Sequence, residues 1–105
     1  MKNKLIVLRN EDVKRVLIGV PRGHKHLRVV IELSDGSKLV FQEATIANIT
    51  RAYVSVITHP LRRGLELVGA KLEKRKRGFA EYQLVESSKD EESIIDEVTE
   101  VVLGC

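Results

Sequence analysis

Positively charged side chains gather at three places in the sequence, and one more stands alone between them. Each cation that neutralises a phosphate releases counterions, so such clusters are typical of proteins that bind nucleic acid. We therefore expect phosphate contacts from Arg62, Arg63, Lys71, Lys74, Arg75, Lys76 and Arg77, and secondary contacts from Arg51, Arg22, Lys25 and Arg28. The alternative interpretation is that the run at 74–77 only keeps a hairpin tip solvated and blocks edge pairing.

Aromatic side chains would complement these cations, because single strands are held by base stacking as well as by charge. The chain has two tyrosines and two phenylalanines and no tryptophan. Phe79 and Tyr82 follow the basic run, but they are three residues apart and point to opposite faces of a strand, so at most one lines a groove. Phe41 and Tyr53 lie on apolar stripes and are expected in the core.

Catalytic and metal-binding patterns are weak in this sequence. His24 and His26 form a His-x-His pair, but two ligands without an acidic or cysteine partner do not predict a metal site. Together with His59 and Glu43 they suggest only one reaction, a metal-independent cleavage of RNA by general acid and base. No phosphate loop or nucleophile motif is present. The lone Cys105 excludes an internal disulfide. Because none of these patterns is strong, we expect no enzyme activity, no metal and no cofactor.

Apolar periodicity indicates an α+β domain on a mainly antiparallel sheet, since the connections between strands are short. The expected order is β-β-β-β-α-β-β-α: strands at 5–8, 13–20 and two within 28–43, a helix at 45–58, strands at 65–72 and 79–85, and a helix between Ser88 and Gly104.

The hairpin within 28–43 also has an expected register. A two-residue Asp35-Gly36 loop would place Leu39 and Phe41 on the wrong face, because a slip of one residue flips every side chain. A three-residue loop with Gly36 in the left-handed conformation instead pairs Ile31 with Leu39.

The two helices are assigned from stripes of apolar residues. Thr45 is the expected N-cap of the first helix, and Pro60 ends it near Thr58. Ser88 and Glu91 form a capping-box pattern before the second helix. The first stripe is Ile46, Ile49, Tyr53, Val56 and Ile57, and the second is Ile94, Ile95, Val98, Val101 and Val102.

The charge of the chain is unevenly distributed over its 105 residues. Residues 1–86 carry seventeen basic and nine acidic side chains, a net charge of +8, whereas residues 87–105 carry one basic and six acidic ones, a net charge of −5. The first part is expected to be a nucleic-acid-binding domain and the second an acidic helix for packing or oligomerisation. Alternatively, the acidic tail docks on the basic body. The abundance of charged residues, 31%, is typical of a thermophile.

Several short phrases resemble the archaeal ThermoDBP-related proteins, a group of small single-stranded DNA-binding proteins. The similarity covers residues 28–86 and extends loosely to the final helix. It implies an antiparallel sheet that cradles a helix, a basic cleft for single-stranded DNA and association through the C-terminal helix. The phrases are Gln42-Glu43-Ala44-Thr45-Ile46, Arg51-Ala52-Tyr53, Thr58-His59-Pro60 with Arg62-Arg63, and Ala80-Glu81-Tyr82-Gln83-Leu84.

Taken together, the sequence predicts a cytoplasmic, non-enzymatic protein that binds single-stranded DNA without sequence preference through a basic cleft, with RNA as a further ligand. A homodimer or larger oligomer is expected through the C-terminal helix. No apolar run reaches the length of about 20 residues that spans a bilayer, so no membrane partner is expected. The alternatives are a metal-independent ribonuclease and a protein-assembly module without a nucleic-acid role.

Overall fold

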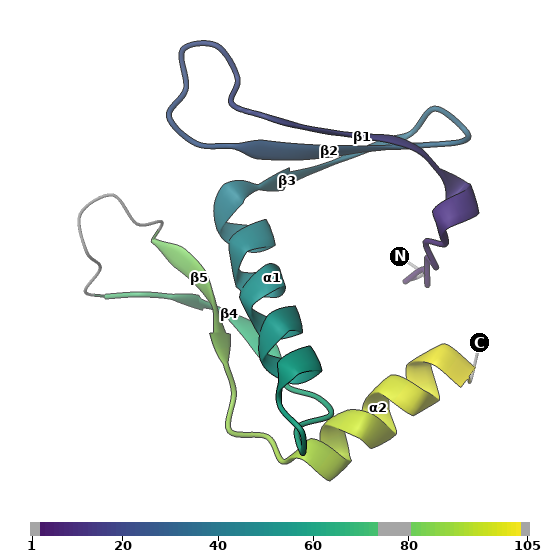
Figure 1. Ribbon diagram of the computed structural model, residues 1–105, viewed down its shortest axis with the longest axis vertical. Coiled ribbons are helices and arrows are strands. Elements are labelled where there is room, and N and C mark those ends of the chain that lie inside the picture. The colour runs from purple at the N-terminus through teal and green to yellow at the C-terminus, as the bar shows by residue number, and fades with distance from the viewer. Residues whose placement is uncertain (1–2, 74–80, 104–105) are drawn as a thin grey trace. The chain divides into compact units, whose positions relative to one another are not determined.

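The computed structural model describes residues 3–73 and 81–103, which form an α+β fold with antiparallel sheets, as expected (Figure 1). The chain divides into two compact units, Met1–Ile46 and Ala47–Cys105. The elements are a 3₁₀ helix η1 (Asn10–Asp12), strands β1 (Val13–Gly19), β2 (Arg28–Leu33) and β3 (Lys38–Gln42), helix α1 (Glu43–Thr58), strands β4 (Leu67–Lys71) and β5 (Tyr82–Glu86), and helix α2 (Glu91–Leu103).

The β2–β3 hairpin confirms the three-residue loop and its register. Ile31 pairs with Leu39, and the Leu33 N–H donates to the Ser37 carbonyl at 2.8 Å. Gly36 has φ +92°, the left-handed conformation that a side chain would strain. Turn chemistry and the apolar alternation agree here, so local sequence predicts this hairpin correctly.

The three-stranded sheet β1-β2-β3 has two unlike faces. One face is aliphatic and aromatic and contains Val29, which is only 6% exposed. On the other face the Arg15 side chain donates to Glu32 at 2.6 Å, and this hydrogen bond lowers the pKa of the Glu32 carboxyl. The apolar face consists of Val16, Ile18, Val29, Ile31, Leu39 and Phe41, as the register of the two strand pairs shows.

The strand expected at 5–8 is wrong: these residues are not paired in either sheet, and all four are exposed. Directly after them the chain turns into η1, where the Arg9 N–H donates to the Asp12 carboxylate at 3.0 Å. A short aliphatic run has the propensity for a strand, but a strand also needs a partner edge. In the described sheet β1 and β3 are the edge strands, and the run at 5–8 pairs with neither of them.

Helix α1 begins at Glu43, two residues before the expected N-cap Thr45, and ends at Thr58 as expected. Its apolar stripe does not lie in the core. Tyr53 is 65% exposed, and Ile49 and Ile57 are exposed as well, so the expectation that Tyr53 is a core residue is wrong. Periodicity identified the helix correctly, but it did not identify the side that packs.

The side of α1 that makes contact is small and polar. Asn48 Nδ2 donates to Gln83 Oε1 on β5 at 3.1 Å, and Ala52 and Ser55, four and seven residues later, are half-buried. This spacing lies along one helix face. In the described chain, the side-chain hydrogen bond between α1 and β5 therefore lies on this face and not on the larger apolar stripe.

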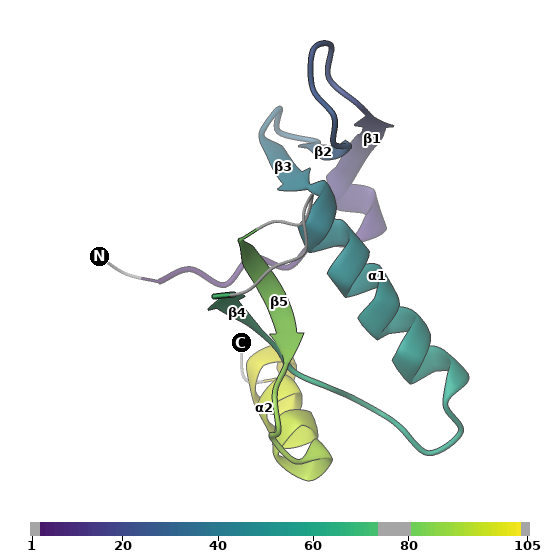
Figure 2. The ribbon, with the colours of Figure 1, turned by 90° about the vertical axis from the view of Figure 1, so that its left-hand side faces the viewer.

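The second hairpin forms a separate two-stranded sheet, β4-β5, rather than extending the first one (Figure 2). Its register is continuous from Leu67–Glu86 to Lys71–Tyr82. The connection, residues 74–80, lies outside the described residues.

Helix α2 begins at Glu91 and is capped by Asp90, so the expected Ser88–Glu91 capping box is wrong. The Ser93 N–H donates to Asp90 Oδ2 at 3.0 Å, and the Ser93 hydroxyl donates to Oδ1 at 2.8 Å. Both hydrogen bonds lower the pKa of Asp90, and the one from the Ser93 backbone N–H has the larger effect. Neither described helix is long and apolar enough to cross a membrane.

Removing this cap tests its role. We expect Asp90→Ala to lower the thermal midpoint by about 4–8 °C at pH 7, because an N–H at the start of α2 loses its acceptor.

A carboxylate with a lowered pKa stabilises the fold above its unfolded pKa, and this contribution is lost as the pH falls through the folded pKa. The difference between variant and wild type should therefore shrink below about pH 4. Melting curves from pH 2 to 7 measure it, with Asp96→Ala as the control. A difference that stays constant over this range would contradict the assignment.

Candidate nucleic-acid interface

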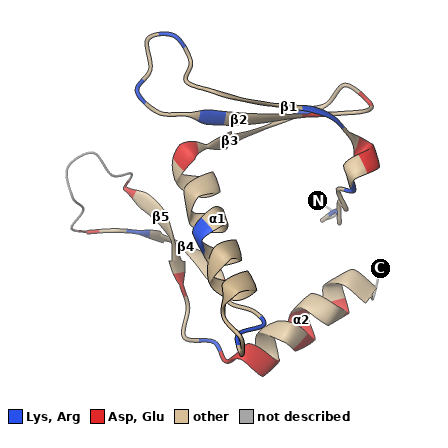
Figure 3. Cartoon of the chain, viewed as in Figure 1, with Lys and Arg blue, Asp and Glu red and all other residues tan. Residues whose placement is uncertain are grey.

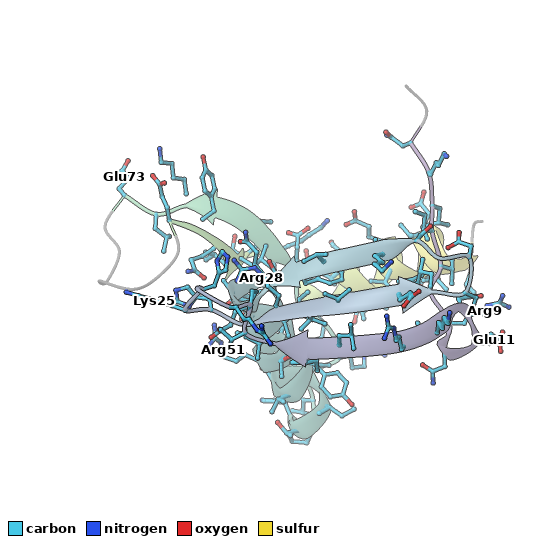
Figure 4. All side chains as sticks on the ribbon, turned by 90° about the horizontal axis from the view of Figure 1, so that it is seen from above. Arg9, Glu11, Lys25, Arg28, Arg51 and Glu73 are labelled. Carbon is cyan, nitrogen blue, oxygen red and sulfur yellow. The ribbon has the colours of Figure 1, made fainter. Side chains whose placement is uncertain are left out.

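The loop between β1 and β2 carries cations that no described carboxylate neutralises. Arg22 and Lys25 are exposed there, and within residues 3–73 and 81–103 neither takes part in an ion pair. Figure 3 shows the loop as a basic end of the first unit. In Figure 4, Lys25 and Arg28 lie at one end of the sheet, whereas Arg9 and Glu11, an ion pair at 3.0 Å, lie at the other.

The end of this loop is held in place by its own hydrogen bonds. The Arg28 guanidinium donates to the carbonyls of His26 and Leu27, at 3.0 and 3.2 Å. The Leu27 N–H donates to the Glu43 carboxylate at 2.7 Å. Arg28 is half-buried, so it shapes the loop, while Arg22 and Lys25 remain available to a ligand.

The expected phosphate ligands after α1 are already paired with carboxylates. Arg62 donates to Glu86 and to the Ser55 hydroxyl, the latter at 2.9 Å. Arg63 lies 3.6 Å from Glu91 and 3.5 Å from Glu92. A phosphate would have to displace a carboxylate at either position, which reduces the gain from binding.

The second-tier cation on α1 has a structural contact of its own. The Arg51 guanidinium donates to Asn48 Oδ1, the side chain whose amide contacts β5. Arg51 is exposed and supports the polar contact between α1 and β5.

The loop end of the β4–β5 ladder brings together two of the expected residues. Lys71 and Tyr82 are direct cross-strand partners. The Lys71 ammonium lies 3.2 Å from the Glu81 carboxylate, and Tyr82 is 66% exposed. The remaining expected residues of this hairpin, Lys74, Arg75, Lys76, Arg77 and Phe79, lie outside the described residues.

The acidic helix is partly neutralised within its own unit. Lys89 donates to Glu97 and lies 3.8 Å from Glu66. The hydrogen bond raises the pKa of Lys89 and lowers that of Glu97. Lys89 itself belongs to the acidic tail, so of these contacts only the two ion pairs of Arg63, with Glu91 and Glu92, join the tail to a basic residue of 1–86, as the alternative of a docked tail expects.

The apolar stripe of α2 is only partly covered. Ile94 is buried at 8% exposure and Ile95 is half-buried, whereas Val98, Val101 and Val102 are exposed. Between α2 and the start of β4 runs an open apolar groove with a volume of about 410 Å³. Its lining comprises Leu65, Glu66, Leu67, Ile94, Glu97, Val98, Val101 and Val102.

The histidines form no recognisable metal or catalytic cluster in the described part of the chain. His26 Nδ1 lies 4.0 Å from Glu43, whose carboxylate already accepts a backbone hydrogen bond. His59 Nδ1 accepts N–H groups of Leu61 and Arg62, both at 3.1 Å, and so shapes the turn after α1. No group of three His, Cys, Asp or Glu side chains is placed to hold a metal ion.

Comparisons with protein-family models, with curated proteins and with solved structures found no match. The functional argument therefore depends on the side chains. The sequence analysis missed two features: the exposure of Tyr53, and the strand glycine Gly69 opposite Leu84. No sequence pattern indicates the first, whereas a glycine between strand-forming residues is a signal for the second.

Proposed function

We propose that the protein binds single-stranded nucleic acid, in particular DNA, without sequence preference and without catalysis. The observation that carries this proposal is the pair of exposed, unneutralised cations Arg22 and Lys25 on a loop held by its own hydrogen bonds. Such cations bind phosphate without first breaking an ion pair, and counterion release then favours the complex. The loop therefore takes precedence over Arg62, Arg63 and Lys71, which are paired with carboxylates.

The preference for single strands has separate support. Tyr82 presents its ring on the surface, and an exposed ring stacks on bases only where these are not stacked inside a duplex. The resemblance of residues 28–86 to ThermoDBP-related proteins favours DNA over RNA.

Fluorescence anisotropy tests the proposal directly. The full chain is titrated into labelled single-stranded DNA, duplex DNA and single-stranded RNA, each at three salt concentrations. We expect the tightest binding to single-stranded DNA and an affinity that falls steeply with salt. Absence of binding at the lowest salt would overturn the proposal and favour a protein-assembly role. Labelled RNA incubated with the protein and EDTA should stay intact, and its cleavage would favour the ribonuclease alternative.

We also propose that α2 mediates homo-oligomerisation. Val98 and Val101 are exposed on the stripe that begins with the buried Ile94, so the stripe continues beyond the part that its own unit covers. A second copy of α2 provides a matching apolar surface, since a two-fold interface pairs one patch with itself.

Charged substitutions on this stripe should dissociate the oligomer. We expect Val98→Asp with Val101→Asp to shift the mass in sedimentation equilibrium from that of a dimer or larger assembly to that of the monomer, because association would bury unpaired carboxylates. Val40→Asp, an exposed valine on β3, should leave the mass unchanged. A wild-type protein that sediments as a monomer at all concentrations would contradict this assignment.

A further inference from the structure

One face of the β4–β5 hairpin combines an open space, an aromatic ring and a cation. Side chains alternate between the two faces of a strand, and directly paired residues share a face. The opposite face carries Gln83, which contacts α1 through Asn48. By the register, the face of interest consists of Leu67, Gly69 and Lys71 on β4 and Glu86, Leu84 and Tyr82 on β5.

Gly69 is unusual within this face. A glycine inside a strand weakens it, and it normally marks a bulge, a tight bend or a close approach by another group. The β4–β5 register continues through Gly69 without a shift, and Gly69 is not among the glycines with positive φ. No described atom lies within 4 Å of the position that its Cβ would take. Neither backbone geometry nor packing in the described part of the chain therefore requires a glycine here.

The open space has an apolar floor and an aromatic side. Leu84 pairs directly with Gly69 and is half-buried. By the register, Tyr82 is the diagonal cross-strand neighbour of Gly69 on this face, and such neighbours are within reach of an aromatic side chain. Tyr82 is 66% exposed, so its side chain is accessible to a ligand.

A positive charge completes the arrangement. Lys71 is the direct partner of Tyr82, and its ammonium is exposed, 3.2 Å from the Glu81 carboxylate. It lies on the same face as the gap, and the phosphate next to a bound base would compete with Glu81 for it. The surface therefore has a planar ring, an apolar floor with room above it, and a nearby cation.

We propose that this face is a stacking subsite for one nucleobase, which lies against the Tyr82 ring above Gly69 and Leu84 with its phosphate near Lys71. The proposal rests on the proposed single-strand binding and gives it a base-contacting residue. The subsite accepts any base, because every base presents a flat aromatic face. Gly69 is needed because a side chain at this position would occupy the space of the base.

The decisive experiment separates base contacts from backbone contacts. Binding of an oligo-dT and of an abasic oligonucleotide of equal length and charge is measured for wild type, Tyr82→Leu and Gly69→Val. We expect both variants to weaken oligo-dT binding by at least about five-fold, the lower end for one stacked base, and to leave abasic binding unchanged. Gly69→Val should also raise the thermal midpoint, because valine favours strands. This variant therefore keeps the test valid even if Tyr82→Leu perturbs folding.

Tyr53→Leu is the matched control. Tyr53 has the same side chain and a similar exposure, 65%, but it lies on α1 and not on the proposed face, so this variant should bind oligo-dT like wild type. Equal weakening of dT and abasic binding in Tyr82→Leu, or unchanged dT binding in Gly69→Val, would overturn the subsite while single-strand binding stands. A wild-type protein that binds neither oligonucleotide would overturn both proposals.

Discussion

Replacing Arg22 and Lys25 together with glutamine should weaken the binding of single-stranded DNA on the order of ten-fold near physiological salt. Both cations are exposed, and no described carboxylate neutralises them. Their replacement therefore removes two phosphate contacts that no competing ion pair weakens. The slope of log affinity against log salt should fall in magnitude by about 1.4, or about 0.7 for each contact to a single strand. Anisotropy titrations at several salt concentrations measure both quantities.

The matched control removes the same charge from cations that carboxylates already neutralise. Arg9 is paired with Glu11 and Asp12, and Lys89 is paired with Glu66 and Glu97. The double variant Arg9→Gln, Lys89→Gln should change the affinity by much less than the loop variant. Equal losses in the two variants would show that net charge alone matters, and an unchanged slope in the loop variant would remove the β1–β2 loop from the binding site.

Replacing Ile94 with alanine should cost about 2 kcal/mol or more of the free energy of unfolding, the low end for a buried isoleucine. Ile94 is 8% exposed and is the most deeply buried side chain described on α2. A Cβ built at Gly64 would lie 3.4 Å from Ile94 and 3.1 Å from Ile95, so the chain passes closely over this part of the helix. Alanine would leave a void at that contact. Urea unfolding followed by circular dichroism measures the loss.

Val101→Ala provides the comparison, since Val101 lies on the same stripe but is exposed. In a monomeric sample it should cost little, because an exposed substitution usually changes stability by under about 0.5 kcal/mol. A similar cost at both positions at every protein concentration would contradict the assignment of Ile94 as the anchor of α2. A cost at Val101 that appears only where the protein associates would support the α2 interface.

Local sequence predicts several elements of the fold well. The β2–β3 hairpin follows from Gly36, which the turn needs in the left-handed conformation, and from alternation that pairs Ile31 with Leu39. Helix α1 ends at Thr58, because Pro60 disfavours helix at the preceding residue. These features depend on residues only a few positions apart, so a reading of the sequence recovers them.

Contacts between distant residues explain where the expectations fail. The run at 5–8 has strand propensity but pairs with no described strand, and Tyr53 is exposed on α1, whose hydrogen bond to β5 comes from Asn48 instead. Asp90 rather than Ser88 caps α2, since the helix begins two residues later than the capping-box pattern suggests. Propensity determines what a segment can form, but not what it packs against.

For the candidate site, the cations, the aromatic residues and the α+β class of the fold can be predicted from local sequence. Which of these side chains are available to a ligand depends on contacts between distant residues. Arg62 and Glu86 are twenty-four residues apart, yet they form an ion pair, whereas Arg22 and Lys25 have no such partner in the described chain. The open space beside Gly69 also depends on the tertiary structure, since no described atom approaches the position of its Cβ. Ion pairing and exposure depend on distances between side chains across the fold, and spacing along the chain does not contain those distances.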